Sequence, residues 1–232
     1  MQLSLSRKIL FYILLIIFLS TLNNKYFSKI ELKGLDKIAI IGLEKKETQD
    51  LLNNLKSFNS KNIFFLKKFE FIRKLEANNL IENYTVFKKY PSTIEIKIEK
   101  TKFLANVFKN GKFYVLGSNG KLIQSDKKND KLPNIFGDYD KTSFFSLLKS
   151  VKKSKFKFSK IKNLYFFKSG RWDIETNQNV IMKFPKENLE DLLNLSLGIL
   201  NNNEFKDIKI LDLRQDNQVI INGKWFKFWS LF

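Results

Sequence analysis

The sequence predicts an α+β fold: an N-terminal transmembrane helix, a small domain with the order β-α-α-β-β, and then an antiparallel β domain with two helices. Three observations predict it. A hydrophobic stretch follows a basic N-terminus, the apolar periodicity changes from helical to alternating near residue 81, and Asn-Gly pairs separate short apolar runs further along the chain. Helices and strands have side-chain periods of about 3.6 and 2, so a change of period marks a change of element.

The composition is that of a folded protein, and it excludes many kinds of catalytic site. The chain has 232 residues, of which 44% are hydrophobic and 28% are charged, so it has room for one large domain or two small ones. It has no cysteine and no histidine, which excludes disulfides, thiol nucleophiles, imidazole bases and metal sites built from those side chains. The sequence also has no glycine-rich phosphate-binding loop. We therefore expect a protein that is not an enzyme and that holds neither a cofactor nor a metal ion.

The net charge is strongly positive. Lysine and arginine number 42 against 23 aspartates and glutamates, which gives a formal charge of +19 that would attract any polyanion. Lysine, asparagine, isoleucine and phenylalanine are abundant, whereas proline and glycine are scarce, a pattern expected from an A/T-rich genome. We favour this compositional origin over a dedicated polyanion site.

A hydrophobic segment near the N-terminus is the membrane candidate in the sequence. Arg7 and Lys8 precede an uncharged and largely apolar stretch. If the helix begins near Leu3, about 20 residues span roughly 30 Å, the thickness of a hydrocarbon core. No convincing cleavage site follows, so we expect an uncleaved anchor whose basic tail stays in the cytoplasm. The predicted segments are a cytoplasmic tail at residues 1–8, a transmembrane helix at 9–24 and a linker at 25–36.

The small domain is predicted over residues 37–101. Residues 93–99 alternate strictly between apolar and polar side chains, so Ile94, Ile96 and Ile98 must share one face. This pattern is typical of a half-buried strand in an antiparallel sheet. The expected elements are a strand at residues 38–43, helices at 44–58 and 67–78, and strands at 81–89 and 93–99.

The β domain is predicted over residues 102–222. Asn110-Gly111 and Asn119-Gly120 supply the positive φ angles of tight hairpin turns, which predicts a β meander from residue 103 to residue 124. The aromatic C-terminal tail, residues 223–232, is either an exposed patch for protein or lipid or a final strand that covers an open sheet edge, and we favour the second interpretation. The remaining expected elements are helices at 143–151 and 187–200 and strands at 161–167, 171–175, 180–184, 208–213 and 218–221.

Six short motifs occur in order along the chain. They are Ile40-Ile41-Gly42-Leu43, Asn62-Ile63-Phe64, Tyr90-Pro91-Ser92-Thr93-Ile94-Glu95-Ile96-Lys97-Ile98-Glu99-Lys100, Leu132-Pro133-Asn134-Ile135-Phe136-Gly137, Arg171-Trp172-Asp173-Ile174 and Leu211-Asp212-Leu213-Arg214. Their order and spacing resemble those of the FtsQ/DivIB family of bacterial division proteins over nearly the whole chain. Lys102 and Gly117 depart from the family's pattern, which often has a proline and an aspartate there.

The resemblance implies a function and a location. It implies a POTRA domain at residues 37–101 and a non-enzymatic divisome scaffold that links early and late division proteins and controls septal peptidoglycan synthesis. The implied partners are FtsB, FtsL and other divisome membrane proteins, with no nucleic acid and no small-molecule substrate. The implied location is the inner membrane at the division septum, with a cytoplasmic N-terminus and periplasmic domains.

The last strands of the β domain are the predicted partner-binding surface. A strand at a sheet edge leaves backbone donors and acceptors unpaired, so a partner can add a strand by β-augmentation. The resemblance implies that residues 211–221 approach the surface that receives FtsB. Trp172, Leu211 and Leu213 are expected in the core, whereas Arg171 is either a partner contact or part of a surface salt bridge. The predicted partner-binding residues are Arg171, Asp212, Arg214, Gln215, Val219, Ile220 and Ile221.

Two alternatives from other classes of protein remain. A membrane-tethered module that binds polyanions would use the +19 charge, with interleaved residues such as Phe156-Lys157-Phe158 stacking on bases or touching lipid. The even spread of lysines along the chain disfavours it. A POTRA protein of outer-membrane assembly or secretion would normally continue into a membrane domain for which this chain has no room.

Overall fold

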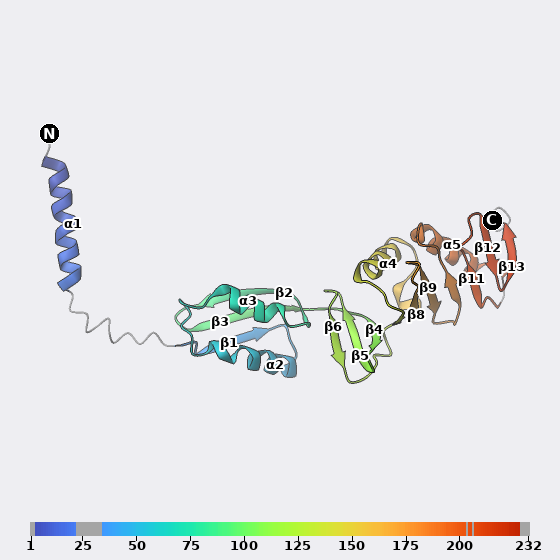
Figure 1. Ribbon diagram of the computed structural model, residues 1–232, viewed down its shortest axis with the longest axis horizontal. Coiled ribbons are helices and arrows are strands. Elements are labelled where there is room, and N and C mark those ends of the chain that lie inside the picture. The colour runs from blue at the N-terminus through green and yellow to red at the C-terminus, as the bar shows by residue number, and fades with distance from the viewer. Residues whose placement is uncertain (1–2, 22–33, 203, 206, 228–232) are drawn as a thin grey trace. The chain divides into compact units, whose positions relative to one another are not determined.

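The chain divides into two compact units in the computed structural model (Figure 1). The units are residues 1–74 with 85–97 and residues 75–84 with 98–232. The structure describes residues 3–21, 34–202, 204–205 and 207–227. Parts of five predicted segments therefore lie outside the described residues: residues 1–2 of the tail, 22–24 of the transmembrane helix, 25–33 of the linker, 203 and 206 of the β domain, and 228–232 of the aromatic tail.

Helix α1, Leu3–Thr21, forms where the sequence predicts a hydrophobic helix. It contains neither glycine nor proline, and its large apolar side chains from Ile9 to Leu19 are all exposed. Within the described residues, no helix combines the length and the apolar character that crossing a membrane requires. The transmembrane assignment stays a prediction.

The smaller sheet has three strands in the order β1-β3-β2 and is accompanied by two helices. Ile94, Ile96 and Ile98 are buried, which confirms the alternation predicted for β3. The helices contribute Leu51 and Phe71 to the buried set. The elements are β1 (Lys37–Ile41), α2 (Lys45–Leu55), a 3-10 turn (Lys56–Phe58), α3 (Lys68–Glu76), β2 (Ile81–Lys89) and β3 (Thr93–Lys100).

The pairing of β1 with β3 corrects the antiparallel prediction. The two strands run parallel, in register from Lys37 opposite Thr93 to Ile41 opposite Lys97. Both helices lie between β1 and the later strands, and a crossover of that length can return the chain in either direction, whereas a tight hairpin can only reverse it. The alternation in β3 therefore predicts which side chains are buried but not the direction of the neighbouring strand.

The larger sheet has ten strands in the order β13-β12-β11-β10-β9-β8-β7-β4-β5-β6. Three of its strands, β4, β5 and β6, form the predicted meander. The elements are β4 (Phe103–Lys109), β5 (Lys112–Gly117), β6 (Leu122–Ser125), β7 (Asn134–Phe136), α4 (Lys141–Lys153), a 3-10 turn (Phe158–Lys160), β8 (Ile161–Phe166), β9 (Trp172–Thr176), β10 (Ile181–Lys183), α5 (Leu189–Asn201), β11 (Ile210–Asp212), β12 (Gln218–Ile221) and β13 (Lys224–Lys227).

This sheet is mixed, so the prediction of an antiparallel β domain is wrong in part. The pairs β7–β8 and β10–β11 are parallel because α4 and α5 connect them as crossovers, and β4–β7 is parallel as well. The strands β7 and β10 run in the same direction, and both crossovers move the same way along the sheet. Right-handed crossovers then place both helices on one face, as Figure 1 shows.

The core lies between these two helices and the sheet. Trp172, Leu211 and Leu213 are buried in it, which confirms their predicted place. Phe156 is also buried there, so it is not available as a stacking platform for a polyanion. Other members come from α4, α5 and the central strands: Phe144, Leu147, Val151, Leu164, Ile174, Met182, Leu193 and Ile199.

Asn-Gly turns fix two hairpins of the sheet. Asn110 and Gly111 have φ angles of 50° and 72°, which confirms the predicted turn between β4 and β5. Asn222 and Gly223, with φ angles of 50° and 85°, form the same kind of turn between β12 and β13. Two positive φ angles in a two-residue loop match the right-handed twist of the strands, which is why this dipeptide favours hairpins. The start of the aromatic tail therefore forms an outer strand, in agreement with the favoured interpretation.

Replacing a core side chain should destabilise this sheet far more than replacing an exposed one. We expect Leu164→Ala, at a fully buried position of β8, to lower the free energy of unfolding by about 2–5 kcal/mol because it leaves a cavity. Urea unfolding followed by tryptophan fluorescence measures this, since Trp172 and Trp225, the tryptophans among the described residues, lie in the larger unit. The control Phe108→Ala, at an exposed position of β4, should cost less than about 1 kcal/mol. Equal losses would contradict the placement of the core.

Candidate partner-binding surface

The face of the ten-stranded sheet opposite α4 and α5 carries a row of side chains near the C-terminal edge. Trp172 and Ile174 of β9 lie in the core, so Asp173 between them points to the opposite face. Residues in register on neighbouring strands share a face of the sheet. The row, called here the β9–β13 row, consists of Asp173, Lys183, Asp212, Ile220 and Trp225, in register from β9 to β13.

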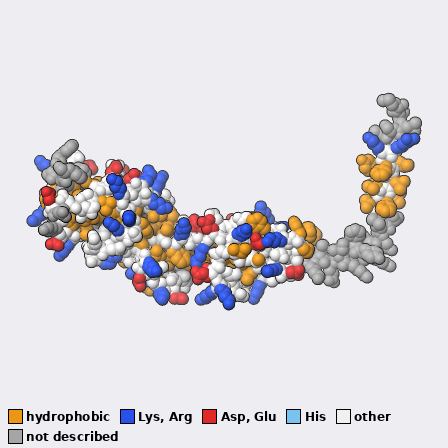
Figure 2. All heavy atoms as spheres, turned by 180° about the vertical axis from the view of Figure 1, so that it is seen from behind, with side chains coloured by type: hydrophobic (Ala, Val, Ile, Leu, Met, Phe, Trp, Pro, Cys, Tyr) orange, Lys and Arg blue, Asp and Glu red, His pale blue; other side chains and the backbone are white. Residues whose placement is uncertain are grey.

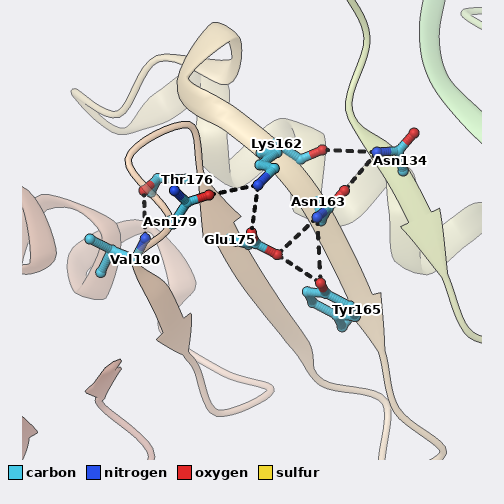
Figure 3. A network of polar contacts seen from close by, with 8 residues as sticks. All are labelled: Asn134, Lys162, Asn163, Tyr165, Glu175, Thr176, Asn179 and Val180. Atoms are coloured by element: carbon cyan, nitrogen blue, oxygen red, sulfur yellow. Dashed lines mark hydrogen bonds and ion pairs between the residues drawn. The ribbon is translucent and has the colours of Figure 1, made fainter. Parts of the chain in front are cut away.

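A polar network continues this face across β7, β8 and β9 (Figure 3). Asn134 Nδ2 donates to Asn163 Oδ1 at 2.6 Å, and Asn163 Nδ2 donates to Glu175 Oε2 at 2.8 Å. Tyr165 Oη donates to the same oxygen at 2.7 Å, and Lys162 Nζ lies 3.2 Å from Glu175 Oε1. Burial acts to raise the pKa of Glu175, but these donors outweigh it and hold the pKa below its usual value. The network therefore keeps the carboxylate charged and orients the polar side chains of this face.

Asp212 and Arg214 form a bidentate pair at the end of β11. Arg214 Nε donates to Asp212 Oδ1 at 2.8 Å, and Arg214 Nη2 donates to Asp212 Oδ2 at 2.6 Å. The backbone N–H of Arg214 donates to Oδ1 as well, at 3.1 Å. Burial acts to raise the pKa of Asp212, but the hydrogen bonds and charge of Arg214 lower it overall. The pair fixes the arginine side chain, since a fork matched to a carboxylate has a single favoured geometry.

Asp173 is the most deeply buried member of the β9–β13 row. It is 4% exposed, and among the described residues its Oδ1 has no hydrogen-bond donor. The nearest cation is Arg171, whose Nε lies 3.6 Å from that oxygen and whose guanidinium stacks 4.1 Å from the ring centre of Phe167. Burial raises the pKa of Asp173, against the opposing charges of Arg171, Arg214 and Lys183. A carboxylate left short of donors has spare hydrogen-bonding capacity.

The edge of the sheet beside this row is β13. The pair Ile221 and Lys224 flanks the two-residue turn, so these residues exchange backbone hydrogen bonds, and the next pair, Ile220 and Trp225, does not. The backbone N–H and C=O of Trp225 therefore point away from β12. Its indole is 66% exposed beside Ile220, whereas Phe226 packs edge-to-face on Phe205, with ring centres 5.3 Å apart. These contacts hold β13 in place while its outer edge stays open within the described residues.

The structure brings the charged members of the predicted site together. Arg171 precedes β9 and contacts Asp173, while Arg214 pairs with Asp212 two strands away. Gln215 lies in the exposed turn that follows. The partner-binding role of these residues stays a prediction.

The predicted residues of β12 lie elsewhere than at the edge. Val219 and Ile221 are buried in the core, and only Ile220 of the three points to the open face. β12 pairs with β11 on one side and β13 on the other, so the edge lies one strand later than residues 211–221. Sequence reasoning missed Asp173, Lys183 and Trp225. The Asn222-Gly223 pair between two apolar runs was the signal that could have located the outer hairpin.

Two family profiles match the chain along most of its length. The profile of the FtsQ-type POTRA domain matches residues 33–100, and that of the C-terminal domain of cell division protein FtsQ/DivIB matches residues 105–214. The chain belongs to the FtsQ/DivIB family. The three-stranded sheet with its two helices is thus the POTRA domain, and most of the ten-stranded sheet is the FtsQ/DivIB C-terminal domain.

Named relatives agree with this assignment. The chain is 24% identical over 190 residues to the cell division protein FtsQ of Rickettsia typhi, a match that covers 81% of this chain and 71% of the relative. It is 30% identical over 149 residues to the cell division protein DivIB of Clostridium botulinum, covering 61% of this chain and 55% of that one. A solved structure, the major extracytoplasmic domain of the trans isomer of DivIB from Geobacillus stearothermophilus, matches 41% of this chain and 87% of its own, with 13% identity and a TM-score of 0.32.

Family membership gives the chain a general role. FtsQ/DivIB proteins are non-enzymatic scaffolds of cell division, which act through protein–protein interactions in the divisome.

The ion pair at Asp212 should make stability depend on pH. A carboxyl group whose pKa is lower in the folded than in the unfolded state, about 3.9, stabilises the fold above that value and loses the contribution as pH falls through the folded pKa. We expect Asp212→Asn to lower the free energy of unfolding by about 1 kcal/mol at pH 7, allowing for solvent screening of the partly exposed Arg214.

The difference between Asp212→Asn and the unmodified chain should shrink below pH 4, as measured by urea unfolding at a series of pH values. Asp216→Asn, in the same turn at an exposed position, is the control and should show little difference at any pH. A loss that persists undiminished at low pH would argue against the ion pair.

Proposed function

We propose that this chain is a divisome scaffold that captures FtsB, together with FtsL, by addition of a partner strand to the outer edge of β13. In this way it links early and late division proteins and controls septal peptidoglycan synthesis. The observation that carries the proposal is the edge of β13, which has no neighbouring strand among the described residues and where the backbone N–H and C=O of Trp225 point away from β12. An added strand would satisfy both groups and gain further pairs along its length.

Side chains beside this edge supply specificity. A strand added to β13 would lie next to Trp225, whose exposed indole offers apolar area and one hydrogen-bond donor. Further into the sheet, this face offers Ile220 and the donor-poor Asp173 of the row, together with the fixed guanidinium of Arg214 beside Asp212. A partner that continues over the open face would meet an apolar contact first and charged groups after it. Such a segment is expected to carry an apolar side chain flanked by acidic ones, which would pair with Arg171 or Arg214.

Strand addition can be tested by one position changed in two ways. Trp225→Pro removes the outward backbone N–H and the indole, while Trp225→Ala removes the indole alone. Neither change removes a hydrogen bond between β12 and β13, because this pair does not exchange any.

We expect Trp225→Pro to weaken capture of an FtsB peptide by about fivefold to tenfold more than Trp225→Ala, since one backbone hydrogen bond contributes about 1 kcal/mol. Pull-down on immobilised peptide measures the capture, and circular dichroism checks the fold. If the two variants retain peptide equally well, pairing with the backbone of β13 is not the source of binding.

We also propose that α1 anchors the chain in the inner membrane, with the N-terminus cytoplasmic and the two folded domains periplasmic. The apolar side chains from Ile9 to Leu19 are exposed all around the helix, which suits a lipid environment. The helix has 19 residues, or about 28 Å, close to the thickness of a hydrocarbon core. Arg7 and Lys8 at its beginning favour a cytoplasmic N-terminus.

Anchoring by α1 predicts resistance to alkaline extraction. The full chain should stay in the membrane pellet at high pH, where peripheral proteins are released. Ile16→Arg places a charge near the middle of the helix at a cost of about 2.5–3.5 kcal/mol, so a larger share should appear in the supernatant. Ile16→Val is the matched control and should behave as the unmodified chain does. Release of the unmodified chain would refute the anchor.

A further inference from the structure

The POTRA domain exposes four aromatic rings, on the loop before α3, in the first turn of α3 and in the turn between β2 and β3. Phe64 is 60% exposed, Phe65 and Phe69 are each 72% exposed, and Tyr90 is 61% exposed. Phe64 and Tyr90 stack with ring centres 4.9 Å apart, which joins the loop before α3 to the turn between β2 and β3. Scattered single apolar residues are normal on a protein surface, but rings gathered in this way mark a contact site.

Lysines accompany these rings. Residues 60–70 and 86–92 together hold five lysines and one carboxylate, Glu70. Lys61 Nζ lies 2.7 Å and Lys67 Nζ 3.9 Å from Glu70, so that single acid already has two cations. Figure 2 shows apolar side chains exposed on the POTRA domain with lysine and arginine side chains beside them. The surface, called here the aromatic–lysine end, consists of Phe64, Phe65, Phe69 and Tyr90 with Lys61, Lys67, Lys68, Lys88 and Lys89.

This is the end of the domain at which the chain enters it. The backbone N–H of Asp36 donates to the carbonyl of Ser92, two residues after Tyr90, at 2.9 Å. A Cβ at Gly34 would collide with the carbonyl of Asn59, so the entering backbone also lies directly against the loop that leads to Phe64. Only residues 22–33 separate this point from α1, and twelve residues cannot span more than about 40 Å.

We propose that the aromatic–lysine end binds the surface of an anionic lipid bilayer, an inference that rests on the proposed anchoring by α1. Aromatic rings are favoured at the level of the lipid headgroups, and each lysine close to an anionic surface adds about a fivefold preference for the bound state. The short connection to α1 keeps this end near the bilayer, so contact takes place at a high effective concentration. A lipid surface fits better than a protein groove because rings and lysines occur together and positive charge is in excess, with five lysines against the two ion-paired carboxylates Glu70 and Glu95.

The absence of cysteine from the sequence makes contact with lipid directly measurable. A single cysteine labelled with an environment-sensitive fluorophore is placed at Ser60, beside the aromatic–lysine end, in the full chain reconstituted into vesicles. Two reference positions are Ile16 in α1 and Ile41, an exposed residue that ends β1 about 13 Å further along the domain. Quenching by spin-labelled lipid reports contact in vesicles of phosphatidylcholine with phosphatidylglycerol and in vesicles of phosphatidylcholine alone.

We expect lipid to quench the label at Ser60 in phosphatidylglycerol vesicles, and much less in phosphatidylcholine alone. The label at Ile41 should stay unquenched, while the label at Ile16 should be quenched in both. Lys68→Gln should lower the ratio of bound to free state about fivefold. The control Lys45→Gln removes the same charge at the other end of the domain and should change the ratio little. Phe64→Ser with Phe65→Ser should also reduce quenching at Ser60.

Three other results would overturn the inference, each in a distinguishable way. No quenching at Ser60 with normal quenching at Ile16 means that α1 is anchored but the POTRA domain does not touch the bilayer. No quenching at Ile16 refutes the anchor, and the inference falls with it. If the fluorescence of the Ser60 label changes only when a division protein is added, and lipid does not quench it, the surface binds a protein partner.

Discussion

Coverage of only one face of the ten-stranded sheet is the constraint on which the surfaces of the larger unit depend. Two crossovers of the same hand, moving the same way along the sheet, place α4 and α5 together and bury the apolar side chains of the strands beneath them. The other face then has to be made soluble by its own side chains. The network around Glu175 and the β9–β13 row meet that need, and they do so with groups that have defined hydrogen-bond geometry. A polar face that is ordered in this way is already arranged for contact with another chain.

The features of the fold that the sequence predicts well are those that depend on neighbouring residues in the chain, such as strand alternation and turn type. Ile94, Ile96 and Ile98 alternate, and all three are buried; Asn110-Gly111 forms a hairpin turn, and the structure has it with the expected φ angles. The relative direction of two paired strands depends on how the segment that connects them packs on the sheet, which local sequence patterns do not reveal. The parallel pairs β1–β3 and β7–β8 were therefore not predicted. The three-residue strand β7 is too short for its periodicity to be recognised.

The candidate site shows the same division between local and non-local information. Arg214 lies two residues from Asp212, and the short Leu-Asp-Leu-Arg motif contains both residues. Their ion pair is therefore a local contact that the sequence itself suggests. Burial raises the pKa of Asp173 against the opposing charges of Arg171, Lys183 and Arg214, which come from three separate segments of the chain. Its burial without a donor to Oδ1 could not be read from the Arg-Trp-Asp-Ile motif alone. The position of the edge depends on the last hairpin, whose Asn222-Gly223 turn precedes the aromatic residues of the tail.

The two-residue connection between β12 and β13 affects how the outermost strand behaves after it is disturbed. Closing so short a loop costs little chain entropy, so β13 finds its register again without searching through distant sequence. An edge strand from a distant part of the chain would have to close a long loop, at a larger cost in chain entropy, whenever it re-formed. A segment added as proposed would consequently meet a template that is already aligned, and its association would not have to wait for this domain to rearrange.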